Sequence, residues 1–443
     1  MVDETPSVNE HYLDRVVEVS ETTTVEAIED IVSGNGIKLV AKGAQIDARV
    51  RDRLLQHKLR KPLETSVRVV DGVASRPMEK VADLLFGRHA LLAGVCGEAG
   101  KRAVAAALRE LRLSTPLESL LSVYAAQGPQ KLEHAVGVGL LAAALMHELA
   151  PADAASRHTL LVAGLLHDAG ELYIDPAILR PGLRLTHEQW KHIAAHPIVA
   201  ARVLREMPGA GPAVADAVLN HHERLDGFGY PQGLAGPKLP LAGQVLGLAE
   251  MLMGVIESGR SPGERASVAV KLIPGEFDRR LLGRVASIAR VVGVSDVAAG
   301  DQAPVQPDEL AAHAVRLAAA LNGLNDLRAT VERRVVRASA ALQALLEHAI
   351  ERCRRIRMAY SSTGLDFLDI DAMRAQVAAM DARTHCEIAI VMREVEWRLR
   401  EVEREARIRA ERLPPGERVL VRQLIDDAKE AARRATDAAL AVS

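Results

Sequence analysis

Residues 160–170 read LLVAGLLHDAG, and this stretch decides both the fold and the chemistry expected of the chain. Its apolar run predicts one face of a buried helix. The run leads directly into His167 and Asp168, whose polar side chains then lie at the end of an apolar helix. Removing them from water costs free energy unless a partner compensates them. A divalent metal is such a partner, because imidazole nitrogen and carboxylate oxygen suit Fe, Mn or Zn better than Ca or Mg.

A second stretch repeats this arrangement. Residues 213–231 read AVADAVLNHHERLDGFGYP, so His221 and His222 follow another apolar helix. Adjacent helical side chains diverge by about 100°, so both imidazoles reach one site only near a helix end or beside a second metal. Gly227 and Gly229 free the backbone to fold close to a ligand. Nine of the fifteen histidines fall within a fifth of the chain, at positions 134, 147, 158, 167, 187, 192, 196, 221 and 222.

The composition predicts a mainly α-helical protein. Of the 443 residues 49% are apolar but only 2% are aromatic, so the core is built from Ala, Leu and Val, which favours closely packed helices. A net charge of −2 with mixed signs gives no case for a nucleic acid polymer as partner. Cys96, Cys353 and Cys386 form no CxxC pair, which fits a reducing compartment. We expect a cytoplasmic protein, because the N-terminus lacks a signal-peptide pattern and the apolar run at 136–146 is too short to span a membrane.

The two motifs together resemble the HD-GYP branch of the HD phosphohydrolases. The likeness is carried by HDAG at 167–170 and HHERLDGFGYP at 221–231, and it covers roughly residues 115 to 300. The resemblance implies a central HD-type helical bundle that hydrolyses the bacterial messenger cyclic di-GMP. It also implies two or three bound metals, most often Fe or Mn. Members with three metals carry Glu where this chain has Gln130, so two divalent metals are expected.

The resemblance further implies which residues bind metal and substrate. The expected metal ligands are His134, His167, Asp168, His196, His221, His222 and Glu250. Asp168 would bridge the two metals, and His167 and Asp168 are the predicted catalytic residues beside a bridging hydroxide that attacks phosphorus. The predicted substrate-binding positions are Glu171, Arg224, Asp226, Gly227, Gly229, Tyr230 and Pro231.

Two of these positions depart from the family pattern. Glu171 stands where the family has Lys, a cation expected near a substrate phosphate. At an effective dielectric of about 20, one unit charge about 5 Å away contributes roughly 3 kcal/mol, so a reversed charge puts substrate affinity in question. Glu250 stands where the family usually has Asp, and its extra methylene changes how the carboxylate reaches a metal.

The flanking regions predict further modules around an HD-GYP-type domain at 112–300. Residues 1–75 read as a small α/β module with strands in 36–43 and 65–70 and a helix at 47–59, followed by connecting helices at 76–111. After a loop at 298–307, residues 308–443 carry long coiled-coil-like helical patterns at 309–360 and 369–413. We expect these C-terminal helices to form a homodimer, and a signalling protein is a possible partner.

Three functions fit the sequence. The first is a metal-dependent phosphodiesterase that converts cyclic di-GMP to linear di-GMP or GMP. The second is a degenerate HD-GYP domain that binds a nucleotide or a protein and signals without turnover. The third is a phosphohydrolase for another nucleotide. Metal content separates the second from the others, and a substrate panel separates the first from the third.

Overall fold

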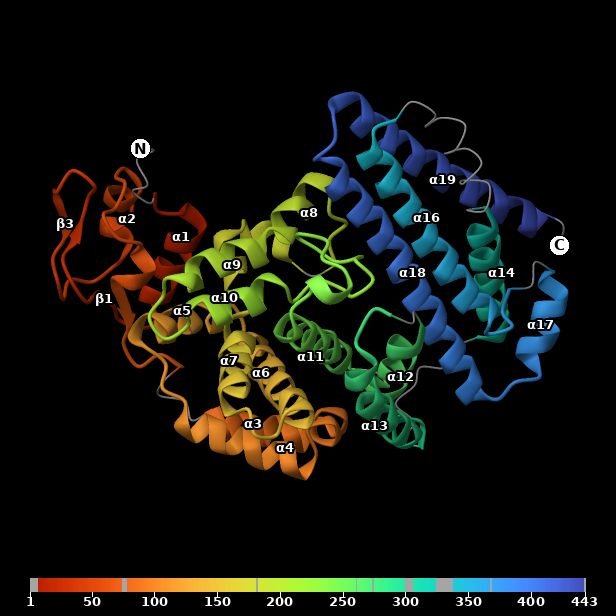
Figure 1. Cartoon of the computed structure of the whole chain (residues 1–443), viewed down its shortest axis with the longest axis horizontal. Coiled ribbons are helices and arrows are strands. Elements are labelled where there is room, and N and C mark those ends of the chain that lie inside the picture. The colour runs from red at the N-terminus through yellow and green to blue at the C-terminus, as the bar shows by residue number, and fades with distance from the viewer. Residues whose placement is uncertain are drawn as a thin grey trace. The chain divides into compact units, whose positions relative to one another are not determined.

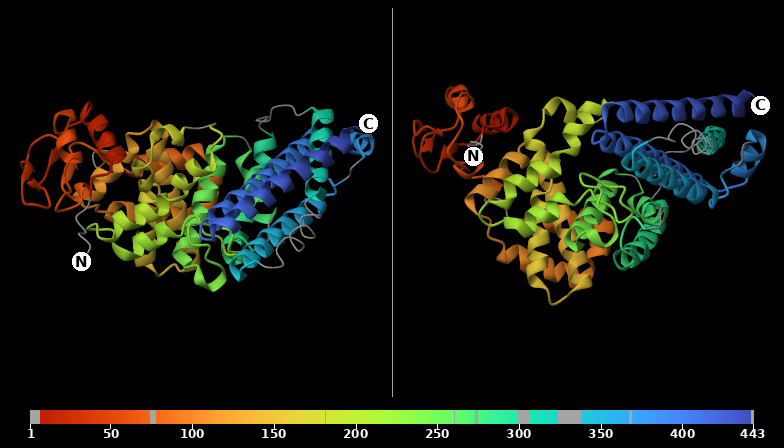
Figure 2. Two further views of the ribbon diagram at one scale, coloured as in Figure 1. Left: turned by 90° about the horizontal axis from the view of Figure 1, so that it is seen from above. Right: turned by 45° about the horizontal axis from the view of Figure 1, so that its top comes forward.

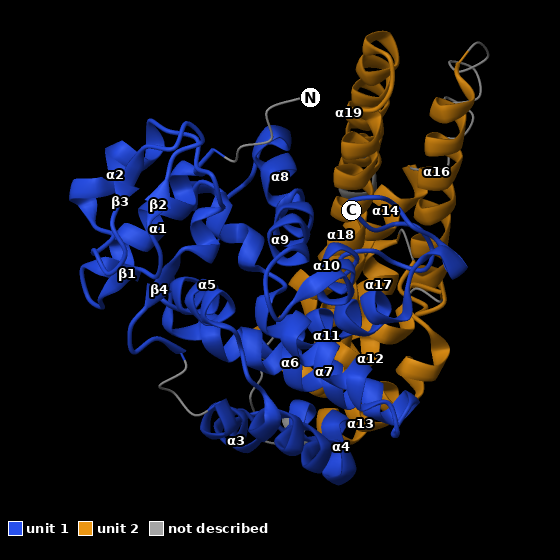
Figure 3. Ribbon diagram, turned by 60° about the vertical axis from the view of Figure 1, so that its left-hand side comes forward, with its two compact units in different colours: residues 1–257 blue, residues 258–443 orange. Residues whose placement is uncertain are grey.

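The computed structural model describes residues 7–73, 78–180, 182–259, 261–272, 275–298, 306–323, 338–366 and 369–441. The chain divides into two compact units, residues 1–257 and 258–443, which Figure 3 shows in different colours. Helices dominate both units, which confirms the predicted mainly α-helical class (Figure 1). Most of the loop predicted at 298–307 lies outside the described residues.

The first unit begins with a small α/β module, which lies at one end of that unit in both views of Figure 2. Its elements are α1 (Glu10–Ser20), β1 (Val25–Ala27), β2 (Ile31–Val32), β3 (Lys38–Val40), α2 (Ala48–Leu55), η1 (Leu63–Thr65) and β4 (Val67–Val69). Strand β1 pairs antiparallel with β4, and β2 pairs antiparallel with β3. The strands predicted in 36–43 and 65–70 are confirmed, whereas the helix predicted over 47–59 ends earlier, at Leu55.

The rest of the first unit is a helical bundle. Its helices are α3 (Met78–Arg88), α4 (Ala90–Glu110), α5 (Thr115–Ala125), α6 (Pro129–Leu149), α7 (Ala154–Leu166), α8 (His187–Ala194), α9 (His196–Arg205), α10 (Gly211–Leu219) and α11 (Leu241–Glu257). Short 3-10 helices lie between them: η3 (Ala169–Tyr173), η4 (Pro176–Leu179) and η5 (Gly236–Lys238). Helix α6 packs against α4, α7 and α11, so it forms the core of the bundle.

Helix α6 combines two features that position the site. Its 21 residues contain an 18-residue window with a mean hydropathy of 1.2, which is long and apolar enough to cross a membrane, but 72% of that window is buried inside the protein. Burial by neighbouring helices accounts for this composition. Glycines also bring α6 and α7 close together, because a Cβ on Gly164 would lie 2.4 Å from the Cα of Gly139. This close approach brings the side chains of the two helices within reach of one another.

The second unit is built from helices alone among its described residues. They are α12 (Pro262–Leu272), α13 (Arg279–Ala298), α14 (Pro307–Gly323), α16 (Ala340–Ser361), α17 (Ile370–Ala378), α18 (Ala382–Ala410) and α19 (Pro415–Ala441). The pattern predicted over 369–413 is therefore interrupted. The side chain of Asp381 accepts a hydrogen bond from the Thr384 amide at 2.8 Å and starts α18 as a separate helix. Residues 324–337 of the other predicted pattern lie outside the description.

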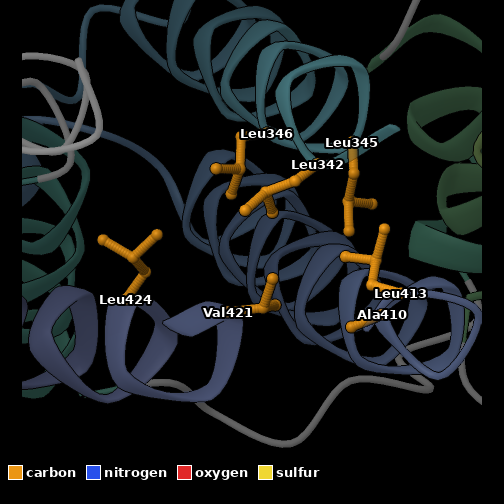
Figure 4. Close-up of a cluster of buried hydrophobic side chains, with 7 residues drawn as sticks. All are labelled: Leu342, Leu345, Leu346, Ala410, Leu413, Val421 and Leu424. Carbon is orange, nitrogen blue, oxygen red and sulfur yellow. The ribbon is translucent and has the colours of Figure 1, made fainter. Parts of the chain in front are cut away.

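Two kinds of contact hold the second unit together. Apolar side chains from α16, the end of α18 and α19 face one another in Figure 4: Leu342, Leu345, Leu346, Ala410, Leu413, Val421 and Leu424. A buried ion-pair network adds to this cluster, in which Glu276 pairs with Arg352 and also, at 3.1 Å, with Arg398. These apolar stripes are thus buried within one chain, and the homodimer stays a prediction.

Candidate metal centre

All seven predicted metal ligands come together inside the first unit. His134 lies on α6, His167 directly follows α7, and Asp168 precedes η3. His196 begins α9, His221 and His222 come just after α10, and Glu250 lies on α11. The two imidazoles of the His-His pair follow the end of α10, so both can turn toward one site, which is the helix-end arrangement expected from the sequence.

The first group of side chains contains His134, His167, Asp168 and Glu250. The Nε2 atoms of His134 and His167 are 3.2 Å apart. One carboxylate oxygen of Glu250, Oε2, lies 3.2 Å from Nε2 of His134 and 3.1 Å from Nε2 of His167. Oδ2 of Asp168 lies 3.7 and 3.4 Å from the same two nitrogens. Ligand atoms of His134, His167 and Asp168 are close enough together to hold one metal ion.

The second group contains His196, His221 and His222, whose ligand atoms are also close enough for one ion. Nε2 of His196 lies 3.3 Å from Nε2 of His221. The rings of His196 and His222 meet edge to face with their centroids 5.0 Å apart. Asp168 joins this group through its other oxygen, because Oδ1 lies 3.4 Å from Nε2 of His196. One carboxylate therefore faces both groups, which is the arrangement of a bridging ligand.

Hydrogen bonds to Nδ1 fix the orientation of the imidazole rings. Nδ1 of His167 lies 2.8 Å from the carbonyl oxygen of Gly164, and Nδ1 of His196 lies 2.8 Å from that of Ile193. Nδ1 of His221 likewise lies 2.5 Å from the carbonyl oxygen of Val218. A carbonyl only accepts, so each Nδ1 carries a proton, and when such a ring is neutral its Nε2 lone pair is directed toward the centre. This is the tautomer that a metal at the centre needs.

The donor set fits a divalent transition metal in each group. Oε2 of Glu250 is buried, lies 3.2 and 3.1 Å from the Nε2 atoms of His134 and His167, and forms no hydrogen bond of favourable geometry with either ring. A buried carboxylate oxygen without a donor is costly unless a cation compensates it. Imidazole nitrogens and carboxylate oxygens together suit Fe, Mn or Zn, and they do not distinguish among these metals.

Comparison with known proteins places this centre in a family. Residues 118–281 match the model of the HD domain family. This region is an HD domain. The chain is 33% identical over 172 residues to cyclic di-GMP phosphodiesterase PA4108 of Pseudomonas aeruginosa, a match covering 38% of this chain and 40% of that protein. It is 32% identical over 127 residues to 3'3'-cGAMP-specific phosphodiesterase 3 of Vibrio cholerae, covering 28% of this chain and 27% of that protein.

These matches confirm the family resemblance that the two motifs carry. The family model covers residues 118–281 and does not extend to the flanking parts of the chain. The chain matches less than half the length of either curated relative. Among solved structures, Bd1817, a HDG"Y"P protein from Bdellovibrio bacteriovorus, is 17% identical with a TM-score of 0.33, covering 61% of this chain and 98% of that chain.

Burial and neighbouring charges set different protonation states in the two groups of the HD domain. Burial lowers the pKa of His221 to about 3, so this imidazole is neutral and ready to bind a metal. Burial also lowers the pKa of His167, but the carboxylates of Asp168 and Glu250 outweigh it and raise that pKa to about 10. Without a metal, His167 therefore keeps an extra proton as the cation facing these carboxylates. A metal that binds there displaces this proton.

The predicted substrate-binding residues after the His-His pair pack back against it. Nη1 of Arg224 donates to the carbonyl oxygens of His221 and Glu223, at 3.3 and 3.0 Å. The ring of Tyr230 stacks on that of His222, with centroids 4.6 Å apart. These contacts support the shape of the metal centre, and a role in substrate binding stays a prediction for this segment.

The glycines and the acid of this segment give it a tight fold. A Cβ on Gly229 would lie 2.4 Å from the Cα of Glu223, and Gly227 has a φ of 79° that favours glycine. Asp226 accepts a hydrogen bond from the amide of Phe228 at 3.1 Å. The peptide bond between Tyr230 and Pro231 is cis. The close approach at Gly229 holds the segment beside the His-His pair.

A cavity of about 580 Å³ opens beside the first group, and His134, Asp168 and Glu250 contribute to its walls. Glu171, the predicted substrate-binding position in η3, also lines it. Its carboxylate accepts a hydrogen bond from Nζ of Lys131 at 2.5 Å. The cation that the family places at position 171 is therefore replaced here by an ion pair whose ammonium comes from α6.

Three polar contacts around the HD domain site have no clear signature in the sequence. Nδ1 of His134 lies 3.0 Å from both carboxylate oxygens of Glu257. The hydroxyl of Tyr124 donates to Oδ2 of Asp168 at 3.2 Å, and Lys131 contacts Glu171 as described. Helical spacing offered a partial signal, because Lys131 lies about one turn before His134 and Glu257 lies about two turns after Glu250.

Proposed function

We propose that the HD domain hydrolyses a phosphodiester bond of cyclic di-GMP, giving linear di-GMP or GMP, with two divalent metals. The observation that carries this proposal is the placement of Asp168, whose two carboxylate oxygens face two separate groups of histidines. Placing a largely desolvated carboxylate, 12% exposed, between two such groups is costly without a compensating cation. It is the expected arrangement for a pair of metals that share a ligand.

The residues divide between the metals as follows. His134, His167 and Glu250 would hold one metal, His196, His221 and His222 the other, and Asp168 would contribute to both. When bound, such a pair lowers the pKa of water and offsets negative charge on the phosphate oxygens. Tyr124 holds Oδ2 of Asp168, and Glu257 keeps Nε2 of His134 turned inward.

The cavity indicates where a substrate would approach. His134, Asp168 and Glu250 line it, so these three residues of the first group face open space, whereas His167 and His221 are fully buried. Its volume lies within the range of about 300 to 1,000 Å³ that is common for small-molecule sites. The names of the relatives point to cyclic dinucleotides, with cyclic di-GMP for one and 3'3'-cGAMP for another.

The test is a hydrolysis assay on the full chain, purified without oxygen and loaded with Fe(II) or Mn(II). Cyclic di-GMP and 3'3'-cGAMP are supplied in parallel, the products are separated by chromatography, and bound metal is quantified. We expect metal-dependent turnover of cyclic di-GMP in the wild type and its loss in Asp168→Asn. The matched control is Asp216→Asn, because Asp216 is a half-exposed acid paired with Arg205 on the surface of α10.

The possible outcomes separate the hypotheses. Faster turnover of 3'3'-cGAMP would move the substrate assignment to that dinucleotide and leave the reaction in place. Two bound metals without turnover of either dinucleotide would favour another phosphate ester. Neither bound metal nor turnover would favour the degenerate signalling domain.

A further inference from the structure

Lys131 presents an ammonium group beside the metal centre. It lies on α6 three residues before His134, and its side chain is 35% exposed in the cavity wall. Nζ donates to Glu171 at 2.5 Å and lies 5.0 Å from the centre of the Tyr124 ring. An ammonium has three donors, so this arrangement leaves hydrogen-bonding capacity for a further acceptor in the cavity.

Arg15 brings a second cation to the same cavity from a different part of the chain. It belongs to α1 of the N-terminal module, and its side chain is only 14% exposed. Nη1 lies 3.4 Å from a carboxylate oxygen of Glu18, which is itself 59% exposed. The Nε atom of Arg15 is buried and has no hydrogen-bond partner. A buried guanidinium nitrogen without an acceptor is costly, so its placement requires an explanation.

The module that carries Arg15 is fixed to the HD domain at the segment that carries Glu171. The ring of Tyr12 stacks on that of Tyr173 with centroids 5.1 Å apart and planes 6° apart. Asn9 donates to the carbonyl oxygen of Tyr173 at 3.4 Å, and the hydroxyl of Tyr173 donates to Glu64 at 2.6 Å. Asn9 and Tyr12 therefore hold the start of α1 against η3, and Glu64 joins η1 to the same tyrosine.

The charges of the cavity leave a role for these two cations. Four acids line it: Asp168 and Glu250, whose charges two divalent metals would more than balance, Glu171, which Lys131 already faces, and Glu257, which faces Nδ1 of His134. A cyclic dinucleotide carries two phosphodiester groups, and only one of them can react at the metals at a time. The other is an anion that must lie elsewhere in the cavity, where an arginine or lysine donor is the usual partner.

We propose that Arg15 and Lys131 bind the phosphates of the substrate, so that the N-terminal module supplies part of the substrate site. This inference rests on the proposed function, because it takes a cyclic dinucleotide as the ligand. Glu171 holds the Lys131 ammonium at the cavity wall. Arg15 adds a second cation to the cavity wall from α1 of the N-terminal module. The module is then a component of the active site and not only an attached regulatory element.

The experiment measures kcat and KM for cyclic di-GMP on the metal-loaded full chain carrying Arg15→Gln or Lys131→Met. Matched controls are Arg49→Gln and Lys101→Met. Arg49 is an exposed arginine of the same module paired with Asp47, and Lys101 is a lysine of α4 paired with Glu98. Loss of one charged hydrogen bond predicts a rise in KM of about 10- to 100-fold. We expect kcat, metal content and the unfolding temperature to change little, and Lys131→Arg to retain most of the affinity.

The outcomes distinguish this inference from the proposed function. Wild-type protein that holds two metals but neither binds nor hydrolyses a cyclic dinucleotide would overturn both. Wild-type turnover with an unchanged KM in either Arg15→Gln or Lys131→Met would overturn this inference alone. The same holds if the control substitutions raise KM equally, or if Lys131→Arg is as impaired as Lys131→Met.

Discussion

Replacing Glu257 by Gln tests whether the carboxylate behind His134 controls one metal and not the other. Both oxygens of Glu257 lie 3.0 Å from Nδ1 of His134, and among the described residues no carboxylate supports Nδ1 of another predicted ligand in this way. Removing such a partner usually weakens metal binding about 10- to 100-fold. The Glu257 side chain is 36% exposed, so water screens part of its charge. We therefore expect the lower end of that range, about tenfold or roughly 1.4 kcal/mol.

The assay is a competition between the full chain and a chelator for Mn(II), with bound metal counted for each chain. In Glu257→Gln one of the two metals should be lost at a lower chelator concentration, and the second should be retained as in the wild type. Glu133→Gln is the matched control, since Glu133 also lies on α6 but pairs with Arg88 away from the centre. Unchanged affinity for both metals would refute the reasoning. Equal weakening of both would show that His134 does not belong to one group alone.

Three further predictions follow from the same contacts. In the metal-free protein the pKa of His167 is raised to about 10, so its protonation stabilises the fold fully below pH 6.5 and progressively less as the pH rises toward 10. The unfolding temperature should therefore fall over that window, while the increase in unfolding temperature on adding Mn(II) should grow. An increase that became smaller with rising pH would contradict this. Glu276→Gln should lower the free energy of unfolding of the second unit, measured with urea, by about 3 to 5 kcal/mol, because it leaves Arg352 and Arg398, each 3% exposed, without their shared carboxylate. A decrease of less than about 1 kcal/mol would contradict this. Gly164→Ala should force α6 and α7 apart, which should lower the metal content and reduce the free energy of unfolding by about 1 to 3 kcal/mol. The control Gly254→Ala has nothing within 4 Å of its added Cβ and should cause neither change.

The side chains that the sequence predicts as metal ligands lie together in the structure, whereas the contacts around them were not predicted. The His-Asp and His-His pairs can be identified from the sequence, because each follows an apolar helix where a polar pair needs a compensating partner. The contacts that orient and charge the site span long distances in sequence. Lys131 and Glu171 are 40 positions apart, and His134 and Glu257 are 123 apart. Helical periodicity indicates which residues share a face, but it cannot indicate which faces meet.

The fold shows the same division between local and long-range information. Low aromatic content and helical periodicity were enough to predict a helical chain, and glycine turns were enough to mark β3 and β4. The break between α17 and α18 was missed because apolar spacing continues across it, while the interruption depends on Asp381 capping the next helix. The position of Arg15 at the cavity could not be predicted from the sequence either, since it depends on how α1 packs against η3.

The two departures from the family pattern bear on whether the domain is active, and each has a structural counterpart. Glu250 was expected to place its carboxylate differently from Asp, yet Oε2 lies within 3.2 Å of both imidazoles of the first group. Glu171 was expected to repel a phosphate, yet Lys131 pairs with it at 2.5 Å and keeps an ammonium at the cavity wall. An ion pair contributes far less repulsion than a lone carboxylate, because the opposing charges lie close together compared with their distance to a third group. The charge reversal at position 171 is therefore a weak argument for a degenerate domain, and metal content becomes the measurement that decides between turnover and signalling alone.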